Sequence, residues 1–262
     1  MPLSFSQLSS YRTCPRQYEY GSIKKLPRQI SAGESFGSSV HNTLKKWGEL
    51  ELVTSDSGLV TSDQLLLFSE EVTTDLPSLT EEKLQDLWHS SFIVQGYESR
   101  VEADMARLKG EKLLRFFYDW WKQEEHIVLL VEKGFSIELE GKKLSGRFDR
   151  VEQVEGGLKV IDYKTSTIRT QEQVDADLQL SVYALACEES LGQPCKELSF
   201  LFLSEEGVTE VITERMPSHL KDAVKQISGI EERIAEGNFH PTPSREVCRG
   251  CPYKGVCDAA SV

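Results

Sequence analysis

Two acidic residues and a lysine stand near the ends of neighbouring predicted strands. Asp162 and Lys164 are two apart, at the end of an apolar run over residues 158–163. Side chains two apart on a strand project from one face, so these two point together and Tyr163 points away. Asp149 lies on the preceding predicted strand, and a short turn can place its carboxylate beside that of Asp162. Taken alone, the Asp162–Lys164 pair also fits an ordinary ion pair at a strand end.

This arrangement carries the parts that phosphodiester hydrolysis needs. Two adjacent carboxylates with access to water form the oxygen-rich site that Mg²⁺ or Mn²⁺ prefers. Such an ion lowers the pKa of bound water and neutralises developing charge. An ammonium group beside it can orient or deprotonate the water and stabilise the phosphate. We therefore expect Asp149, Asp162 and Lys164 to be catalytic, with the two aspartates also binding the metal ion.

Cysteine forms the second chemically capable pattern. Cys248, Cys251 and Cys257 follow the spacing C-x₂-C-x₅-C. Three close thiols need a fourth to close a metal site, and Cys14 is the candidate. Because the first residues do not resemble a secretion signal, a disulfide framework is a poor interpretation. Four thiolates suit structural zinc as well as a [4Fe–4S] cluster, so the spacing leaves both open.

The composition is that of an ordinary globular chain. Of the 262 residues, 39 % are hydrophobic, and no apolar run approaches the roughly 20 residues that span a membrane. We expect a cytoplasmic protein that does not associate with a membrane. Cys187 and Cys195, which lie outside the cysteine pattern, are interpreted as small core residues.

The net charge of -12 argues against a simple electrostatic DNA binder, because phosphate binding needs lysine and arginine. It does not exclude a nuclease, since metal-binding carboxylates add negative charge and a basic groove can coexist with an acidic exterior. Local basic clusters are present, and each also fits a solvated surface. They are Arg12, Arg16, Lys24, Lys25 and Arg28; Lys142, Lys143 and Arg147; and Arg245, Arg249 and Lys254.

Hydrophobic spacing divides the chain into helical and strand-rich parts. Helices are expected over residues 33–50, 81–125 (two helices), 176–190 and 218–236. Strands are expected over residues 127–139, 144–154, 158–163, 198–204 and 208–213. A loose connection is expected over 51–80 and a loop-like tail over 238–258. This order predicts an α/β core with an N-terminal helical insertion.

At its acidic residues the sequence resembles the PD-(D/E)XK nuclease superfamily. The hallmark of that superfamily is an acid, a variable gap, and then acid–x–Lys on adjacent strands. Asp149 matches the first acid, and Asp162-Tyr163-Lys164 matches the second part. The motif is short, so its weight depends on further matches elsewhere in the chain.

Two such matches are similar to the RecB-type branch, which includes AddB-type nucleases and CRISPR adaptation nucleases. They are Gln179 with Tyr183 on the helix after the motif, and the stretch from Gly37 to His41 upstream. The resemblance implies that His41 is a metal ligand beside the aspartates and that the Tyr163 carbonyl completes the set. It also implies that Gln179 and Tyr183 support the site or touch DNA. Without it, His41 would be a surface or capped histidine, and the other two would be ordinary helix residues.

The distant pairing of one N-terminal cysteine with a C-terminal triplet also resembles the iron–sulfur arrangement of this branch. It implies a [4Fe–4S] cluster on Cys14, Cys248, Cys251 and Cys257 that staples the chain ends together. The expected fold is a single domain with a restriction-endonuclease-like core, a central mixed sheet flanked by helices, over residues 126–237. The helical insertion covers 51–125, and the iron–sulfur subregion comprises 1–30 and 238–262.

The resemblance implies a DNA nuclease that requires Mg²⁺ or Mn²⁺, acting as an exonuclease on single-stranded DNA or DNA ends in repair, recombination or CRISPR spacer acquisition. DNA is the expected partner, with a helicase or a CRISPR integrase subunit as candidate protein partners. The sequence has no G-x₄-G-K-[ST] loop, so any motor belongs to another chain. The alternatives are a catalytically silent nuclease-like module and a zinc-stabilised nucleic-acid-binding protein. Glu132 could reach the site from the first strand, but it carries little weight.

Overall fold

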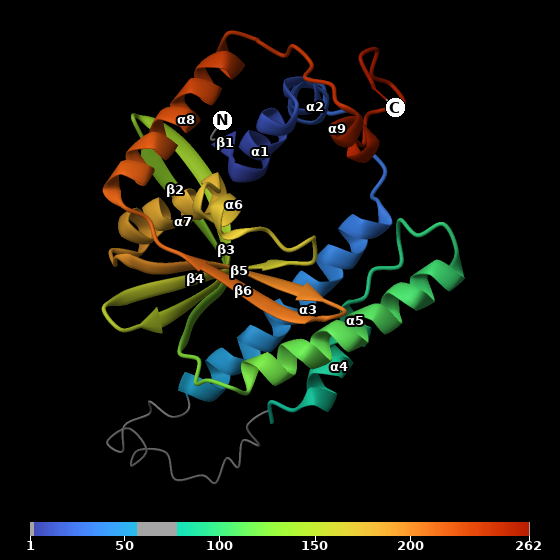
Figure 1. The fold of residues 1–262 in the computed structure, drawn as a ribbon, viewed down its shortest axis with the longest axis vertical. Coiled ribbons are helices and arrows are strands. Elements are labelled where there is room, and N and C mark those ends of the chain that lie inside the picture. Colours follow the sequence, from blue (N-terminus) through green and yellow to red (C-terminus); the bar gives the residue numbers. More distant parts are fainter. Residues whose placement is uncertain (1–2, 57–77, 262) are drawn as a thin grey trace, which may run out of the picture.

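A six-stranded mixed sheet lies at the centre of the computed structural model, which describes residues 3–56 and 78–261 (Figure 1). Along the sheet the order is β1-β3-β4-β5-β6, and β2 pairs with the other edge of β3. Pairing is parallel between β1 and β3 and between β4 and β5, and antiparallel elsewhere. The strands are β1 (Leu3–Ser4), β2 (Val128–Leu139), β3 (Lys142–Val154), β4 (Gly157–Lys164), β5 (Cys195–Ser204) and β6 (Gly207–Thr213).

One edge of β3 is shared by two strands. β1 pairs with it at Leu144 and Ser145, and the pairing with β4 begins at Arg150. Residues 146–149 therefore face the space between β1 and β4. Asp149 is the last of these residues, so the sheet itself places this carboxylate beside an opening.

Helices surround the sheet, and side-chain caps fix where several of them begin. Ser4 and Gln7 form a capping box at the start of α1, which ends at its C-cap, Cys14. Asp177 caps α7 by accepting a hydrogen bond from the backbone of Gln179. The helices are α1 (Phe5–Thr13), α2 (Pro15–Tyr18), α3 (Ala32–Asp56), α4 (Glu81–Ser91), α5 (Arg100–Trp121), α6 (Gln171–Asp175), α7 (Leu178–Ala186), α8 (Pro217–Ala235) and α9 (Arg245–Gly250), with π-helical turns at Glu19–Ile23 and Cys187–Leu191.

The helices form two layers, one on each face of the sheet (Figure 1). α3, α4 and α5 bury an aromatic-rich cluster against one face. α1, α7 and α8 bury a larger aliphatic cluster against the other. The side chains of β4 are shared between the two clusters: Tyr163 packs with α3 and α5, whereas Val160 packs on the opposite face. This is the alternation that a strand buried on both faces requires.

The structure confirms the expected α/β fold with a central mixed sheet flanked by helices. Several expected boundaries were wrong. Residues 51–56 continue α3 rather than beginning a loose connection, and residues 57–77 of that expected connection lie outside the described residues. The tail expected to be loop-like contains α9, and the elements β1, α1, α2 and α6 were not predicted. In the described ranges, no helix combines the length and the apolar content that crossing a membrane requires.

Candidate active site

Three side chains from three elements converge around Asp149. His41 comes from α3, Glu132 from β2 and Asp149 from β3, and one ligand atom of each lies within 4.8 Å of the others. His41 Nδ1 is 3.3 Å from Asp149 Oδ2. The same Asp149 oxygen accepts a hydrogen bond of 3.0 Å from the backbone N–H of Tyr163. The structure thus brings together His41 and Asp149, which the sequence placed 108 residues apart.

Glu132 was expected to carry little weight, yet it lies within 4.8 Å of ligand atoms of His41 and Asp149. Val131 pairs with Arg150 across the β2–β3 hairpin, so the residues next to them, Glu132 and Asp149, lie opposite each other. The backbone of Glu132 has a φ of 49°, in the left-handed region that non-glycine residues rarely adopt and that often marks functional sites. Pairing residues at equal distances before and after the turn at Glu140 and Gly141 would have identified Glu132 as the residue opposite Asp149.

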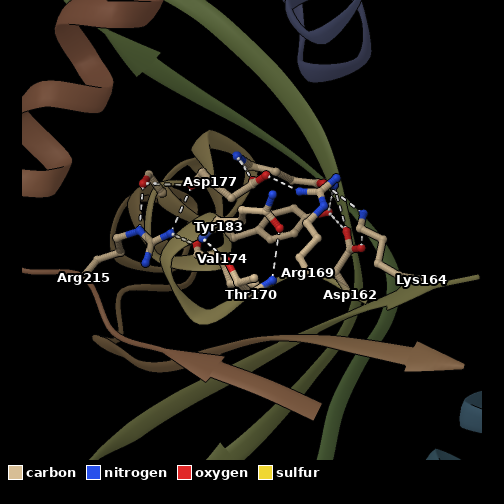
Figure 2. A network of polar contacts seen from close by, with 11 residues as sticks. Asp162, Lys164, Arg169, Thr170, Val174, Asp177, Tyr183 and Arg215 are labelled. Atoms are coloured by element: carbon tan, nitrogen blue, oxygen red, sulfur yellow. Dashed lines mark hydrogen bonds and ion pairs between the residues drawn. The ribbon is translucent and has the colours of Figure 1, made fainter. Parts of the chain in front are cut away.

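Asp162 is buried among hydrogen-bond donors. Its Oδ1 accepts bonds of 2.7 Å from the Tyr183 hydroxyl and of 2.7 Å from Gln179 Nε2. Its Oδ2 forms an ion pair with Lys164. Figure 2 shows Lys164 beside Asp162, with Tyr183 reaching the aspartate from α7. Asp162 and Lys164 therefore lie on one face of β4 and the Tyr163 side chain on the other, as the strand pattern predicted.

Gln179 connects this pair to a fixed helix start. Its Oε1 accepts a hydrogen bond of 3.1 Å from Lys164 Nζ. The Asp177 cap that holds the Gln179 backbone is itself paired with Arg169 at 2.7 Å. Arg215 donates to the backbone carbonyl of Asp177 from the other side (Figure 2). The start of α7 is thus held by two arginines, and Gln179 meets Asp162 and Lys164 from a defined position.

Burial and crowding shift the pKa values of these groups. Burial raises the pKa of Asp162; the charge of Lys164 opposes this increase, and that of Asp149 adds to it. Burial lowers the pKa of His41, but its hydrogen bond with Asp149 and the negative charges nearby outweigh that effect and raise it. Burial and Asp162 together hold the pKa of Tyr183 well above its ordinary value, so its hydroxyl stays a donor. Because the pKa values of His41 and Asp162 are raised, this site favours added positive charge. A bound divalent cation would supply that charge in place of protons.

A cleft of about 470 Å³ gives solvent access to these groups. It is lined by His41, Asp149, Asp162, Lys164, Gln179 and Tyr183, together with Ser4, Phe5 and Ser6 at the start of α1 and the β3 segment from Ser145 to Arg147. Ser6 also lines a groove of about 930 Å³ that extends to the C-terminal cysteine segment. The cleft and the groove therefore meet at the first turn of α1.

The four patterned cysteines line one small cavity. Cys14 lies between α1 and α2, Cys248 lies in α9, and Cys251 and Cys257 lie in the turns that follow. Burial raises the pKa of Cys251, and the nearby charges of the other three thiolates raise it further. Within residues 3–56 and 78–261, no three of the cysteine sulfurs lie within 4.8 Å of one another.

The other two cysteines behave as core residues. Cys187 is fully buried in the aliphatic cluster, and Cys195 packs against it. Neither lines the cavity formed by Cys14 and the C-terminal triplet. The structure therefore separates the six cysteines into the two groups that the sequence predicted.

Comparison with known proteins gives consistent results. A model of the PD-(D/E)XK nuclease superfamily matches residues 2–258. The Gene 69 protein of Mycobacterium phage D29 is 26 % identical over 271 residues, which cover 98 % of this chain and 97 % of that protein. The CRISPR-associated exonuclease Cas4 of Francisella tularensis subsp. novicida is 29 % identical over 124 residues, 47 % of this chain and 60 % of that protein. A crystal structure of a candidate exonuclease from Eubacterium rectale covers 100 % of this chain and 91 % of its own, with a TM-score of 0.51 at 12 % identity, and shares the fold.

Proposed function

The chain belongs to the PD-(D/E)XK nuclease superfamily, and on that premise we propose that it is a deoxyribonuclease requiring Mg²⁺ or Mn²⁺ that acts as an exonuclease on single strands or DNA ends. The observation that carries this proposal is the gathering of one histidine, three carboxylates and one lysine around Asp149 of β3. They are His41, Glu132, Asp149, Asp162 and Lys164.

The donor set fits a hard divalent cation, because it offers carboxylate oxygens and one imidazole nitrogen. Asp162 Oδ2 is buried and forms an ion pair but no well-directed hydrogen bond with the described residues, so it has a lone pair to give. We assign His41, Glu132, Asp149 and Asp162 as ligands, with the Tyr163 carbonyl as a further one. When bound, the ion would lower the pKa of a water molecule and neutralise charge on the phosphate.

Lys164 is the residue that acts on the water and the phosphate. Its ammonium lines the cleft, where Asp162 and Gln179 hold it in place. A fixed positive charge there orients the attacking water and stabilises the negative charge that develops on the phosphate. Gln179 and Tyr183 both bond to Asp162, which supports the positioning role rather than direct contact with DNA.

The DNA-binding surface is proposed to lie on the cysteine-containing segments. Residues 3–31 and 238–261 contain eight lysines and arginines against three acidic residues, whereas the whole chain carries 30 basic and 42 acidic residues. Arg28, Arg249 and Lys254 line the groove that meets the cleft at Ser6. Three glutamates line the same groove, and one of them, Glu34, pairs with Arg28, so a DNA strand would be held mainly by Arg249 and Lys254 on its way to the metal site.

The cysteine cavity is proposed to hold a [4Fe–4S] cluster. All four thiols line that one cavity, which gives a four-thiolate site its full set of ligands. The resemblance to the iron–sulfur branch favours the cluster over a zinc ion. The group would act as a staple, because Cys14 and the C-terminal triplet lie more than 230 residues apart in sequence.

The cellular setting is proposed from the relatives. Cas4 of Francisella is described as a CRISPR-associated exonuclease, and it covers about half of this chain. This supports exonuclease activity in CRISPR spacer acquisition, with repair or recombination as the other setting. A CRISPR integrase subunit or a helicase is the corresponding protein partner.

The test is a nuclease assay on anaerobically purified protein with end-labelled single- and double-stranded DNA. We expect stepwise shortening from an end in Mn²⁺ or Mg²⁺ and none in excess EDTA. Equal cleavage in EDTA would refute the metal-dependent mechanism. Protein that binds DNA but is inert with either ion would instead be a silent nuclease-like module.

A further inference from the structure

Arg150 is a charged residue buried in the interior of the protein. It follows Asp149 on β3 and is 1 % exposed. Its neighbour in the β4 ladder is Ile161, which belongs to the aromatic-rich cluster under α3, α4 and α5. Asp149 faces the cleft, so the two adjacent side chains leave opposite faces of the strand.

The guanidinium is held by two buried carboxylates from different elements. Its two terminal nitrogens both donate to Glu51 of α3, with Nη2 at 2.9 Å from Oε1. Its Nε donates to Glu152 of β3 at 2.6 Å. Trp121, at the end of α5, donates to Glu51 at 2.7 Å, and His126 Nδ1 lies 3.0 Å from Glu152. The network therefore ties α3 and the end of α5 to β3.

Such a network is weak evidence for a role in stability. Replacing a buried ion group with apolar residues of similar volume is often neutral or stabilising, because desolvation offsets the attraction between the charges. A bidentate arginine–carboxylate pair provides direction instead, because the planar guanidinium donates its two parallel hydrogen bonds to the carboxylate in one relative orientation. The bidentate pair thus specifies where Glu51, and with it α3, lies along and around β3.

The same helix carries His41 to the metal site. His41 and Glu51 are ten residues apart on α3, about 15 Å along its axis. Between them α3 passes close to β2 at Gly48, where an added Cβ would lie 2.6 Å from the Val131 side chain. Apolar packing of this kind brings the helix near but tolerates small shifts. The bidentate pair of Arg150 with Glu51, which we call the clamp, supplies the directional contact.

We propose that Arg150 is a positioning residue for the candidate metal site: by clamping Glu51 it fixes α3 against β3, and so fixes the approach of His41 to Asp149. The inference rests on the proposed function only in treating these two residues as metal ligands. Arg150 itself touches neither the metal nor the DNA. Strand β3 thus supplies one ligand, Asp149, on one face. On the other face its next residue, Arg150, sets the position of the second ligand, His41, through α3.

Two variants test the clamp. Arg150→Lys keeps the charge but cannot form the bidentate pair. The triple variant Glu51→Gln, Arg150→Met and Glu152→Gln removes every charge of the clamp, so no buried carboxylate is left without its partner and folding is preserved. We expect both to bind Mn²⁺ at least about 10-fold more weakly in calorimetric titration. We also expect faster hydrogen exchange of α3 amides around His41 in metal-free protein, at a melting temperature close to that of the wild type.

The matched control is Lys159→Met with Glu210→Gln, which removes a buried ion pair of 2.8 Å between β4 and β6 that does not involve α3. It should leave Mn²⁺ affinity and α3 exchange unchanged. Wild-type affinity and exchange in the Arg150 variants would overturn the proposal, as would an equal loss in the control. A failure of the proposed function is distinct: Mn²⁺ binding by the wild type would then be insensitive to His41→Ala and Asp149→Ala, while the exchange data would still decide whether the clamp orders α3.

Discussion

Lys164 donates a hydrogen bond of 3.1 Å to the side-chain oxygen of Gln179, and the nitrogen of the same amide donates to Asp162. One side chain on α7 thus bridges the two polar groups at the end of β4. An amide is well suited to this, because it offers a donor to the carboxylate and an acceptor to the ammonium. The separation of the proposed metal ligand and the proposed water-positioning lysine is therefore set by a neighbouring helix as well as by their own strand.

Lys164→Ala should retain Mn²⁺ binding and lose most DNA cleavage. The ammonium acts on water and phosphate and is not a ligand, so we expect a loss of roughly 10²- to 10⁴-fold in kcat with little change in metal affinity. Single-turnover cleavage and calorimetric Mn²⁺ titration measure the two quantities. Lys143→Ala, an exposed lysine on β3, is the control and should cleave normally. Wild-type cleavage by Lys164→Ala would rule out this role.

Glu132→Gln should weaken Mn²⁺ binding at least about 10-fold and lower the cleavage rate in parallel. The expectation follows from its position opposite Asp149 and within ligand distance of His41. Glu138→Gln changes an exposed acid on the same strand and should have no effect. If both variants bind Mn²⁺ like the wild type, Glu132 is not a ligand.

Asp162→Asn should stabilise the metal-free protein near neutral pH. The raised pKa of Asp162 means that the folded state binds its proton more tightly than the unfolded chain does. The destabilisation caused by the ionised carboxylate is therefore complete above the folded pKa and vanishes as the pH falls below the unfolded value of about 3.9. We expect a higher melting temperature for the variant at neutral pH, converging with the wild type in acid.

Mn²⁺ provides the control for that measurement. It should raise the melting temperature of the wild type, because a ligand that binds only the folded state stabilises it. The same addition should have much less effect on Asp162→Asn. A variant that is less stable than the wild type at neutral pH without metal would show that ionised Asp162 is not a source of strain.

Protein purified without oxygen should be brown, with visible absorption that bleaches on reduction. Replacing any of Cys14, Cys248, Cys251 or Cys257 with Ala should remove iron and make the chain ends more sensitive to protease, because the staple between them is lost. Cys187→Ala, in the aliphatic core, is the control and should keep its iron. Colourless protein with one zinc per chain would show that the cavity is a zinc site.

Arg249→Ala combined with Lys254→Ala should weaken binding of single-stranded DNA, because both side chains line the groove that leads to the cleft. Losing two phosphate contacts should reduce the slope of log affinity against log salt by about 1.4. Fluorescence anisotropy at several salt concentrations measures it. Lys221→Ala with Lys225→Ala removes the same charge from α8 and should leave the slope unchanged. An unchanged slope in the groove variant would place the DNA elsewhere.

The sequence predicted the relation of Asp162 to Lys164 because strand alternation is a local rule. Asp149 followed from one hairpin, which is nearly local as well. Glu132 needed the exact register of a second hairpin, and a shift of one residue would have turned its side chain to the other face. The register could be counted from the turn, but its left-handed backbone could not be foreseen from a glutamate in an apolar strand.

Elements formed by long-range contacts were the hardest to predict. β1 has two residues, too few for any periodicity, and it exists because it pairs with β3 more than 140 residues away. The clamp at Arg150 joins residues 99 apart, and an isolated arginine in a strand gives no sign of its partner. The cysteines were grouped correctly despite their distance because thiols suggest a shared ligand through their chemistry rather than through local structure.

Helix α1 begins at a residue of the cleft and ends at a residue of the cysteine cavity: Ser4 is its N-cap and Cys14 its C-cap. Its nine residues span about 13 Å, and a hydrogen-bonded helix of this length is stiff along its axis. Ser4 also pairs with Ser145 of β3, so one end of the helix is anchored in the sheet while the other end carries Cys14. The cleft and the cysteine cavity thus have one helix in common as part of their walls, although they share no ligand.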